Sequence, residues 1–199
     1  AYEERLSDSP TPTSAKYQSE FLRLFNAAVL ENNLKWPAFQ QDRQLALDAA
    51  HWIEQRGLYQ RGHNMIWGSR QYMPQEIWQQ YDALQATDPI AAQNFLRQAV
   101  RGRVADAAEA LQGTVAEWDV VNEPFANHDL TDILGDDELL EWYRIARAVD
   151  PEVKLVLNDY GIFSDNGRNQ DHRANFDYWL ERLTAENLID ILGEQGHYD

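Results

Sequence analysis

The chain has 199 residues, of which 44% are apolar and 25% charged, a composition typical of a folded globular protein. Its formal net charge of −16 argues against nucleic acid and anionic membranes as partners, because both are bound by clustered Lys and Arg. The sequence contains no Cys, which excludes disulfides and thiolate chemistry, and no run of about 18 apolar residues that could span a membrane.

Residues 1–16 form a polar N-terminal segment in which Ser and Pro predict a loop. From residue 17 to residue 199, short apolar runs alternate with longer segments of helical periodicity, and we interpret this part as one domain. The predicted strands cover residues 25–30, 59–67, 115–123, 153–160 and 189–198. The predicted helices cover residues 37–57, 88–113, 136–149 and 173–186, bounded by Pro, Asp or Gly signals where these occur.

This alternation predicts an α/β protein with a parallel sheet, either an open doubly wound sheet or part of a (β/α)8 barrel. No G-x-G-x-x-G motif follows the first strand, which disfavours a dinucleotide-binding fold. Every predicted strand carries polar residues at its carboxyl end, where barrel enzymes place their chemistry. These residues are Asn32, Lys35, His63, Asn122, Glu123, Asn158, Gln195 and His197. Because a complete barrel needs about 250 residues, we predict a partial barrel with about strands two to six of eight.

The strongest single motif is W-D-V-V-N-E at residues 118–123. A carboxylate that ends a buried strand is partly removed from water, which suits Glu123 to protonate a leaving oxygen. Asn122 beside it could hydrogen-bond a sugar hydroxyl. The alternative is a strand-end Glu that only caps the following loop.

Five motifs in this order resemble glycoside hydrolase family 10, the xylanase-type retaining glycosidases. They are F-N with E-N-x-x-K-W at residues 25–36, R-G-H-x-M-x-W at 61–67, W-D-V-V-N-E at 118–123, N-D-Y at 158–160 and Q-x-H at 195–197. The resemblance covers nearly the whole chain from about Tyr17 onward.

The resemblance implies a role for each matching residue. Glu123 would be the general acid and then the general base, and Asn122 would bind the 2-hydroxyl of the sugar at the cleavage point. Asn32, Lys35, His63 and Trp67 would shape the glycone side of the cleft. Gln195 and His197 would orient the nucleophile, and Asn158 and Tyr160 would line the cleft further along. A zinc site at His63 and His197 lacks carboxylate-rich partner spacing, so we expect neither a metal nor another cofactor.

Two departures from the family pattern bear on function. Gly68, Ser69, Arg70 and Gln71 follow Trp67 where the family has His, Ser and Gln, which leaves the sugar preference open. Arg70 could meet an acidic substituent, although an ordinary surface Arg is the simpler interpretation. The chain also ends before strand seven, where the family's nucleophile Glu lies, and neither Glu194, Asp159 nor Asp199 fits that position.

We therefore expect a truncated, secreted or periplasmic endo-1,4-β-xylanase type of glycosidase that is catalytically poor alone. Its partners would be xylan or xylo-oligosaccharides, and association with another copy or the missing segment would cover its exposed sheet edges. The alternatives are a non-catalytic carbohydrate-binding relative, an inactive fragment of such an enzyme, or an open-sheet enzyme of unrelated chemistry.

Overall fold

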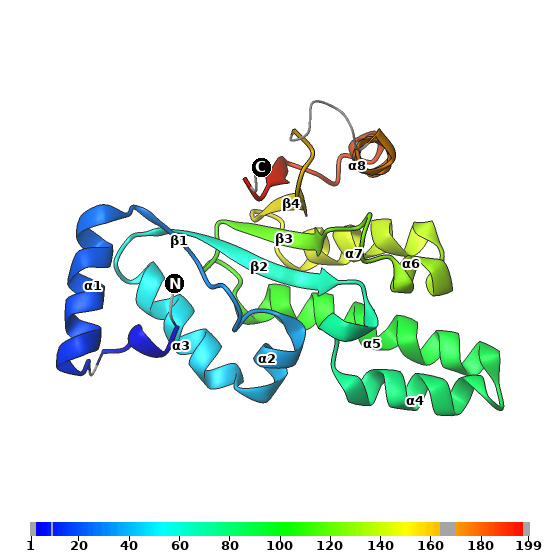
Figure 1. Cartoon of the computed structure of the whole chain (residues 1–199), viewed down its shortest axis with the longest axis horizontal. Helices are drawn as coiled ribbons and strands as arrows, with labels where there is room; N and C mark the ends of the chain where they lie inside the picture. Colours follow the sequence, from blue (N-terminus) through cyan, green and yellow to red (C-terminus); the bar gives the residue numbers. More distant parts are fainter. Residues whose placement is uncertain (1–2, 9, 164–169, 197–199) are drawn as a thin grey trace.

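The computed structural model describes residues 3–8, 10–163 and 170–196. Five parallel strands form one curled sheet in the order β1-β2-β3-β4-β5, so that each strand pairs with the next in sequence (Figure 1). The strands are β1 (Ala27–Val29), β2 (Tyr59–Trp67), β3 (Glu117–Asn122), β4 (Lys154–Asp159) and β5 (Ile191–Glu194). The sheet is half of a barrel, which confirms the predicted α/β class and the partial (β/α)8 barrel. Association that would cover the outer strands β1 and β5 stays a prediction.

The helices are α1 (Pro12–Leu24), α2 (Trp36–Gln41), α3 (Arg43–Glu54), α4 (Gln75–Gln85), α5 (Pro89–Ala110), α6 (Asp129–Leu134), α7 (Asp136–Val149) and α8 (Gln170–Ala185), with short 3-10 helices η1 (Glu3–Arg5) and η2 (Arg70–Tyr72). Helices α3, α5 and α7 pack along one side of the sheet (Figure 1). None of the described helices is long and apolar enough to cross a membrane.

The core lies between these helices and the sheet. Helix α5 buries Leu96, Val100 and Val104 completely, because their spacing of four residues keeps them on one helix face. Trp118 of β3 is also buried, and it packs so closely on β2 that a Cβ at Gly62 would lie 2.3 Å from its ring. Gly62 is therefore required for strand packing rather than for chemistry.

The strand register aligns the carboxyl ends of the strands. Trp67 of β2 is opposite Asn122 of β3, Asn122 is opposite Asn158 of β4, and Asp159 is opposite Glu194 of β5. Parallel pairing thus brings residues from four strands to one edge of the sheet. The register shifts between His63 and Ile66, and between Asp119 and Val121, and such irregularities re-aim side chains.

Several predicted elements match the structure, and others do not. Strand 59–67 and helix 136–149 are confirmed to the residue. The single helix predicted over residues 37–57 is wrong, because Asp42 ends α2 and caps α3 by accepting a hydrogen bond from the Leu45 amide. The loop predicted over residues 1–16 is wrong from Pro12 onward, where α1 begins. Helices α4 and α6 were not predicted.

Candidate active site

Glu123 follows directly after β3 and has a backbone conformation that is uncommon for a residue with a side chain. Its φ is +53°, in the left-handed region. Two backbone hydrogen bonds fix this turn: the Glu123 amide donates to the Asn158 carbonyl (2.8 Å), and the Glu123 carbonyl accepts from the Asn127 amide (3.0 Å). Such conformations persist where the surrounding structure imposes them, and they are concentrated at functional sites.

The Glu123 carboxylate is held by two neutral amides. Gln195 Nε2, just beyond β5, donates to Oε1 at 2.8 Å, and Asn127 Nδ2 donates to Oε2 at 3.1 Å. Among residues 3–8, 10–163 and 170–196, no Lys, Arg or His forms an ion pair with this carboxylate. The side chain is half-buried, so it is both oriented by protein donors and accessible from outside.

Asn122 joins Glu123 to the neighbouring strands. Its Oδ1 accepts from Asn158 Nδ2 at 2.6 Å and from Gln195 Nε2 at 3.3 Å. Its Nδ2 is buried and has no acceptor among the described residues. A buried amide donor without an acceptor is costly, and a ligand hydroxyl would satisfy it.

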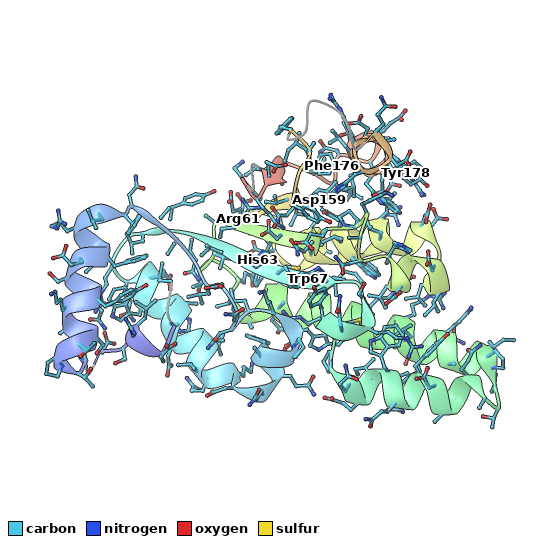
Figure 2. All side chains as sticks on the ribbon, in the orientation of Figure 1. Arg61, His63, Trp67, Asp159, Phe176 and Tyr178 are labelled. Carbon is cyan, nitrogen blue, oxygen red and sulfur yellow. The ribbon has the colours of Figure 1, made fainter. Side chains whose placement is uncertain are left out.

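A charged cluster continues this network across β2, β3 and β4. Arg61 donates from Nε to Asp119 Oδ1 (2.9 Å) and from Nη2 to Asn158 Oδ1 (2.9 Å), and His63 Nδ1 lies 2.7 Å from Asp119 Oδ2. Arg61 and His63 follow one another along β2 (Figure 2). A Cβ at Gly193 would lie 2.5 Å from Arg61 Nη2, so this glycine gives the guanidinium room to reach Asn158.

A cavity of about 510 Å³ lies at this cluster, and four of the predicted site residues line it. The lining residues are Val29, Glu31, Lys35, Arg61, His63, Asp119, Asn158, Glu194 and Gln195. Lys35 Nζ donates to Asn32 Oδ1 at 3.0 Å and lies 5.2 Å from the centre of the Trp67 ring. The cavity surface therefore carries both charged and amide groups, as a binding site for a polar ligand requires.

Tyr160 adjoins a buried carboxylate and imidazole, the side chains of Asp159 and His172. Asp159 Oδ1 accepts from the Tyr160 amide (2.8 Å) and lies 2.9 Å from His172 Nε2. The His172 ring stacks on Phe125 and meets Tyr160 edge-on. Burial raises the pKa of the Asp159 carboxyl to about 6, and the Glu123 charge adds to the rise. Burial also raises the pKa of the Tyr160 phenol, with smaller contributions from Asp159 and Glu123.

The structure thus brings most of the predicted site residues together. Glu123, Asn122, Asn158 and Gln195 form one hydrogen-bond network, which reaches His63 through Arg61 and Asp119. Lys35, Asn32 and Trp67 lie together on the β2 side, and Tyr160 lies beside Asp159. His197 lies outside the described residues. Within the described residues, no group of three or more His, Asp or Glu is placed to hold a metal ion.

Sequence reasoning missed four residues that contact this site: Asn127, Asp119, Arg61 and Tyr72. Asn127 could have been found, because it follows Glu123 by four residues in a turn and carries an amide. Asp119 and Arg61 belong to the motifs that were recognised, but their pairing depends on strand register. Tyr72 stacks on Trp67 with the ring centres 3.5 Å apart, and it lies in the loop that departs from the family pattern.

Comparison with curated proteins finds xylanases among the relatives. Endo-1,4-beta-xylanase 3 of Hypocrea jecorina is 29% identical over 180 residues, which are 84% of this chain and 47% of the relative. Endo-1,4-beta-xylanase 5-like of Arabidopsis thaliana is 24% identical over 194 residues, covering 93% of this chain and 32% of the relative. The chain therefore spans about half, or less, of the length of these relatives.

Solved structures share the fold at low identity. A GH10 structure from Paenibacillus barcinonensis superposes with a TM-score of 0.78 at 24% identity, covering 99% of this chain and 59% of that one. Xylanase 10B of Thermotoga petrophila, solved in complex with xylobiose, gives a TM-score of 0.78 at 22% identity, covering 99% and 58%. The sequence model of glycosyl hydrolase family 10 matches residues 3–199, and the chain therefore belongs to this family.

Proposed function

We propose that this chain carries the acid/base half of a retaining glycosidase that cleaves internal β-1,4 links of xylan, with Glu123 as the general acid/base. One observation carries the proposal: the Glu123 carboxylate is oriented by two neutral amides, Gln195 and Asn127, at distances of 2.8 and 3.1 Å. Amide donors hold a carboxyl group in place without neutralising its charge, so it can gain and lose a proton without breaking an ion pair.

In the first step, Glu123 donates a proton to the glycosidic oxygen while a nucleophilic carboxylate attacks the anomeric carbon and the bond to the leaving sugar breaks. In the second step, the Glu123 carboxylate removes a proton from water, and the water oxygen displaces the nucleophile with net retention of configuration. The Asn122 Nδ2, which has no acceptor in the described part of the chain, would donate to the 2-hydroxyl of the sugar at the cleavage point.

We also propose that the nucleophile comes from outside these 199 residues. A retaining mechanism needs a second carboxyl about 5 to 5.5 Å from the first. Besides Glu123, three described carboxylates near the ends of β3, β4 and β5 are engaged by other groups: Asp119 with Arg61 and His63, Asp159 with His172, and Glu194 with the amides of Gly161 (3.1 Å) and Ile162 (3.0 Å). The 199-residue chain should therefore hydrolyse xylan poorly on its own, and rapid turnover by this chain would refute this part of the proposal.

The substrate assignment rests on the named relatives, which are endo-1,4-β-xylanases, and on the neutral hydrogen-bonding groups of the site. Because a long polysaccharide such as xylan does not cross a membrane, we propose that the protein is secreted or periplasmic. Cleavage of xylo-oligosaccharides in place of long chains would redefine the substrate without changing the role of Glu123.

The role of Glu123 is tested with aryl β-xylobiosides, using a protein that includes whatever coding sequence follows Asp199. Glu123→Gln should lower kcat/KM by about 100-fold or more for phenols of high pKa, which need protonation to leave. It should have little effect on bond cleavage for strongly acidic phenols. The matched control is Glu109→Gln, an exposed carboxylate on α5, which should leave both rates unchanged.

Two results would contradict the assignment. Equal loss with all leaving groups would mean that Glu123 positions the substrate without transferring a proton. A protein that binds xylohexaose with equal affinity before and after Glu123→Gln, and hydrolyses nothing, would be a carbohydrate-binding relative.

A further inference from the structure

The loop between β2 and α4 places a second aromatic ring against Trp67. The Tyr72 and Trp67 rings are stacked face to face, with their centres 3.5 Å apart and an angle of 9° between their planes. The Lys35 ammonium group lies 5.2 Å from the same indole centre. Tyr72 therefore covers one face of Trp67, and that face is not available to a sugar while the stack persists.

Arg70 fixes this loop. Its guanidinium group makes two hydrogen bonds of 2.9 Å to Asp82 and lies 4.3 Å from the centre of the Trp78 ring, both on α4. The Arg70 amide donates to Asp129 Oδ2 of α6 at 2.9 Å. Arg70 is thus engaged within the protein, which agrees with the simpler interpretation of this residue, and Tyr72 two positions later is held in place.

The hydroxyl and the ring of Tyr72 could both contact a ligand. Its hydroxyl has no hydrogen-bond partner among the described residues, and the side chain is only half-buried. It also lies near the carboxyl ends of the strands, because it stacks on Trp67, which is opposite Asn122 in the sheet. The pKa of Tyr160 is raised by burial first, and then by the nearby Asp159, Glu123 and Tyr72. Tyr72 and Glu123 are therefore both close enough to Tyr160 to interact with it electrostatically.

We propose that Tyr72 is a specificity-determining residue that binds one sugar of the xylan chain, with Trp67 supporting it from behind. This inference rests on the proposed function. The flat C–H face of a xylose unit would lie on the face of the Tyr72 ring that points away from Trp67, and a sugar hydroxyl would hydrogen-bond the phenol. Trp67 then acts through Tyr72 instead of stacking on the sugar itself.

The test is the dissociation constant of xylohexaose, measured by calorimetry for the slowly hydrolysing Glu123→Gln form of the protein, with any coding sequence that follows Asp199, and for three variants of that form. Tyr72→Leu removes the flat ring but keeps an apolar group against Trp67, and binding should weaken about 10-fold. Tyr72→Phe removes only the hydroxyl, and binding should weaken about 3-fold. Gln71→Ala, an exposed neighbour in the same loop, should bind as the Glu123→Gln form does.

The outcomes separate the two proposals. If the Glu123→Gln form does not bind xylohexaose, the proposed function fails and the inference falls with it. If the Glu123→Gln form binds but Tyr72→Leu and Tyr72→Phe bind equally well, the inference alone is wrong. Tighter binding by Tyr72→Leu would also overturn it, because Tyr72 would then be blocking the Trp67 face. Tyr72→Phe retains the stacked ring, so it decides the hydroxyl contact even if the Leu variant does not fold.

Discussion

Two carboxylates at β3, four residues apart in sequence, are held in opposite ways. Asp119 is almost fully buried and pairs with two basic side chains, Arg61 and His63, at 2.5 and 2.7 Å. Glu123 is half-buried and, among the described residues, its carboxylate is held only by the side-chain amides of Gln195 and Asn127. Asp119 therefore balances the charge of a half-buried guanidinium, whereas Glu123 is oriented without an ionic partner among the described residues. We propose that the first group supports the site and that the second carries out the chemistry.

We expect the largest effect on stability at a fixed pH from removing the ion pair between Asp119 and Arg61. Asp119→Asn keeps the shape of the side chain but leaves Arg61 without its main anionic partner. Removing one partner of a fully buried ion pair costs about 3–5 kcal/mol. Because the Arg61 side chain is 27% exposed and Glu117 is also near it, we expect a loss of about 2–3 kcal/mol in the free energy of unfolding, measured in urea.

The control for this variant is Arg43→Ala, which breaks the exposed Arg43–Asp106 pair. Exposed pairs contribute about 1 kcal/mol or less. Equal losses for Asp119→Asn and Arg43→Ala would show that burial of the Asp119 cluster is not what stabilises it.

A third carboxylate, Asp159, sharpens the comparison through its pH dependence. Its folded pKa is raised to about 6 by burial, whereas the unfolded value is about 3.9. Its contribution to stability is therefore complete below about pH 4 and is lost as pH rises through 6, by about 3 kcal/mol in total. Asp159→Asn cannot titrate, so the difference in unfolding free energy between the protein and this variant should shift by that amount between pH 4 and 7.

Urea unfolding of both forms across this pH range measures the shift. If the difference in unfolding free energy between the protein and Asp159→Asn does not change with pH, the folded and unfolded pKa values of Asp159 are the same. If the protein instead gains stability relative to the variant as pH rises, His172 holds Asp159 ionised.

We expect the smallest effect from removing either amide that hydrogen-bonds the Glu123 carboxylate. Gln195→Ala removes the shorter hydrogen bond to Glu123, and Asn127→Ala removes the longer one. Each should lower kcat/KM by about 10-fold, because the acid/base group loses part of its orientation. Unfolding free energies should change by about 1 kcal/mol or less, which distinguishes these residues from Asp119. Unchanged kinetics in both variants would show that Glu123 does not depend on amide support.

The elements that sequence predicted well have unambiguous local signals. β2 lies between the turn signals Gly57 and Gly68 and has the strand-favouring residues Tyr59, Ile66 and Trp67 near its ends. α7 places its buried residues on one helical face after an acidic first turn. Helix α4 was missed because its segment contains four Gln and few aliphatic residues, and its burial comes from Trp78 and Tyr81. α6 is only six residues long, too short for helical periodicity to be recognised.

The residues at the strand ends were predictable as a group, but their contacts were not. Simple alternation would place Asp119, Val121 and Glu123 on one face of β3. The register shift between Asp119 and Val121 and the left-handed conformation of Glu123 break that alternation. The pairing of Asp119 with Arg61 and the approach of Gln195 to Glu123 depend on these irregularities, which no local pattern in the sequence specifies.

The central claim, that Glu123 faces the sugar at the common end of the strands, is tested most directly by a crystal structure of Glu123→Gln with a bound xylo-oligosaccharide. The amide of residue 123 should lie about 3 Å from a glycosidic oxygen, with a hydroxyl of the adjoining sugar bonded to Asn122 Nδ2. A sugar chain bound on another surface, or residue 123 turned away from the bound chain, would contradict the account.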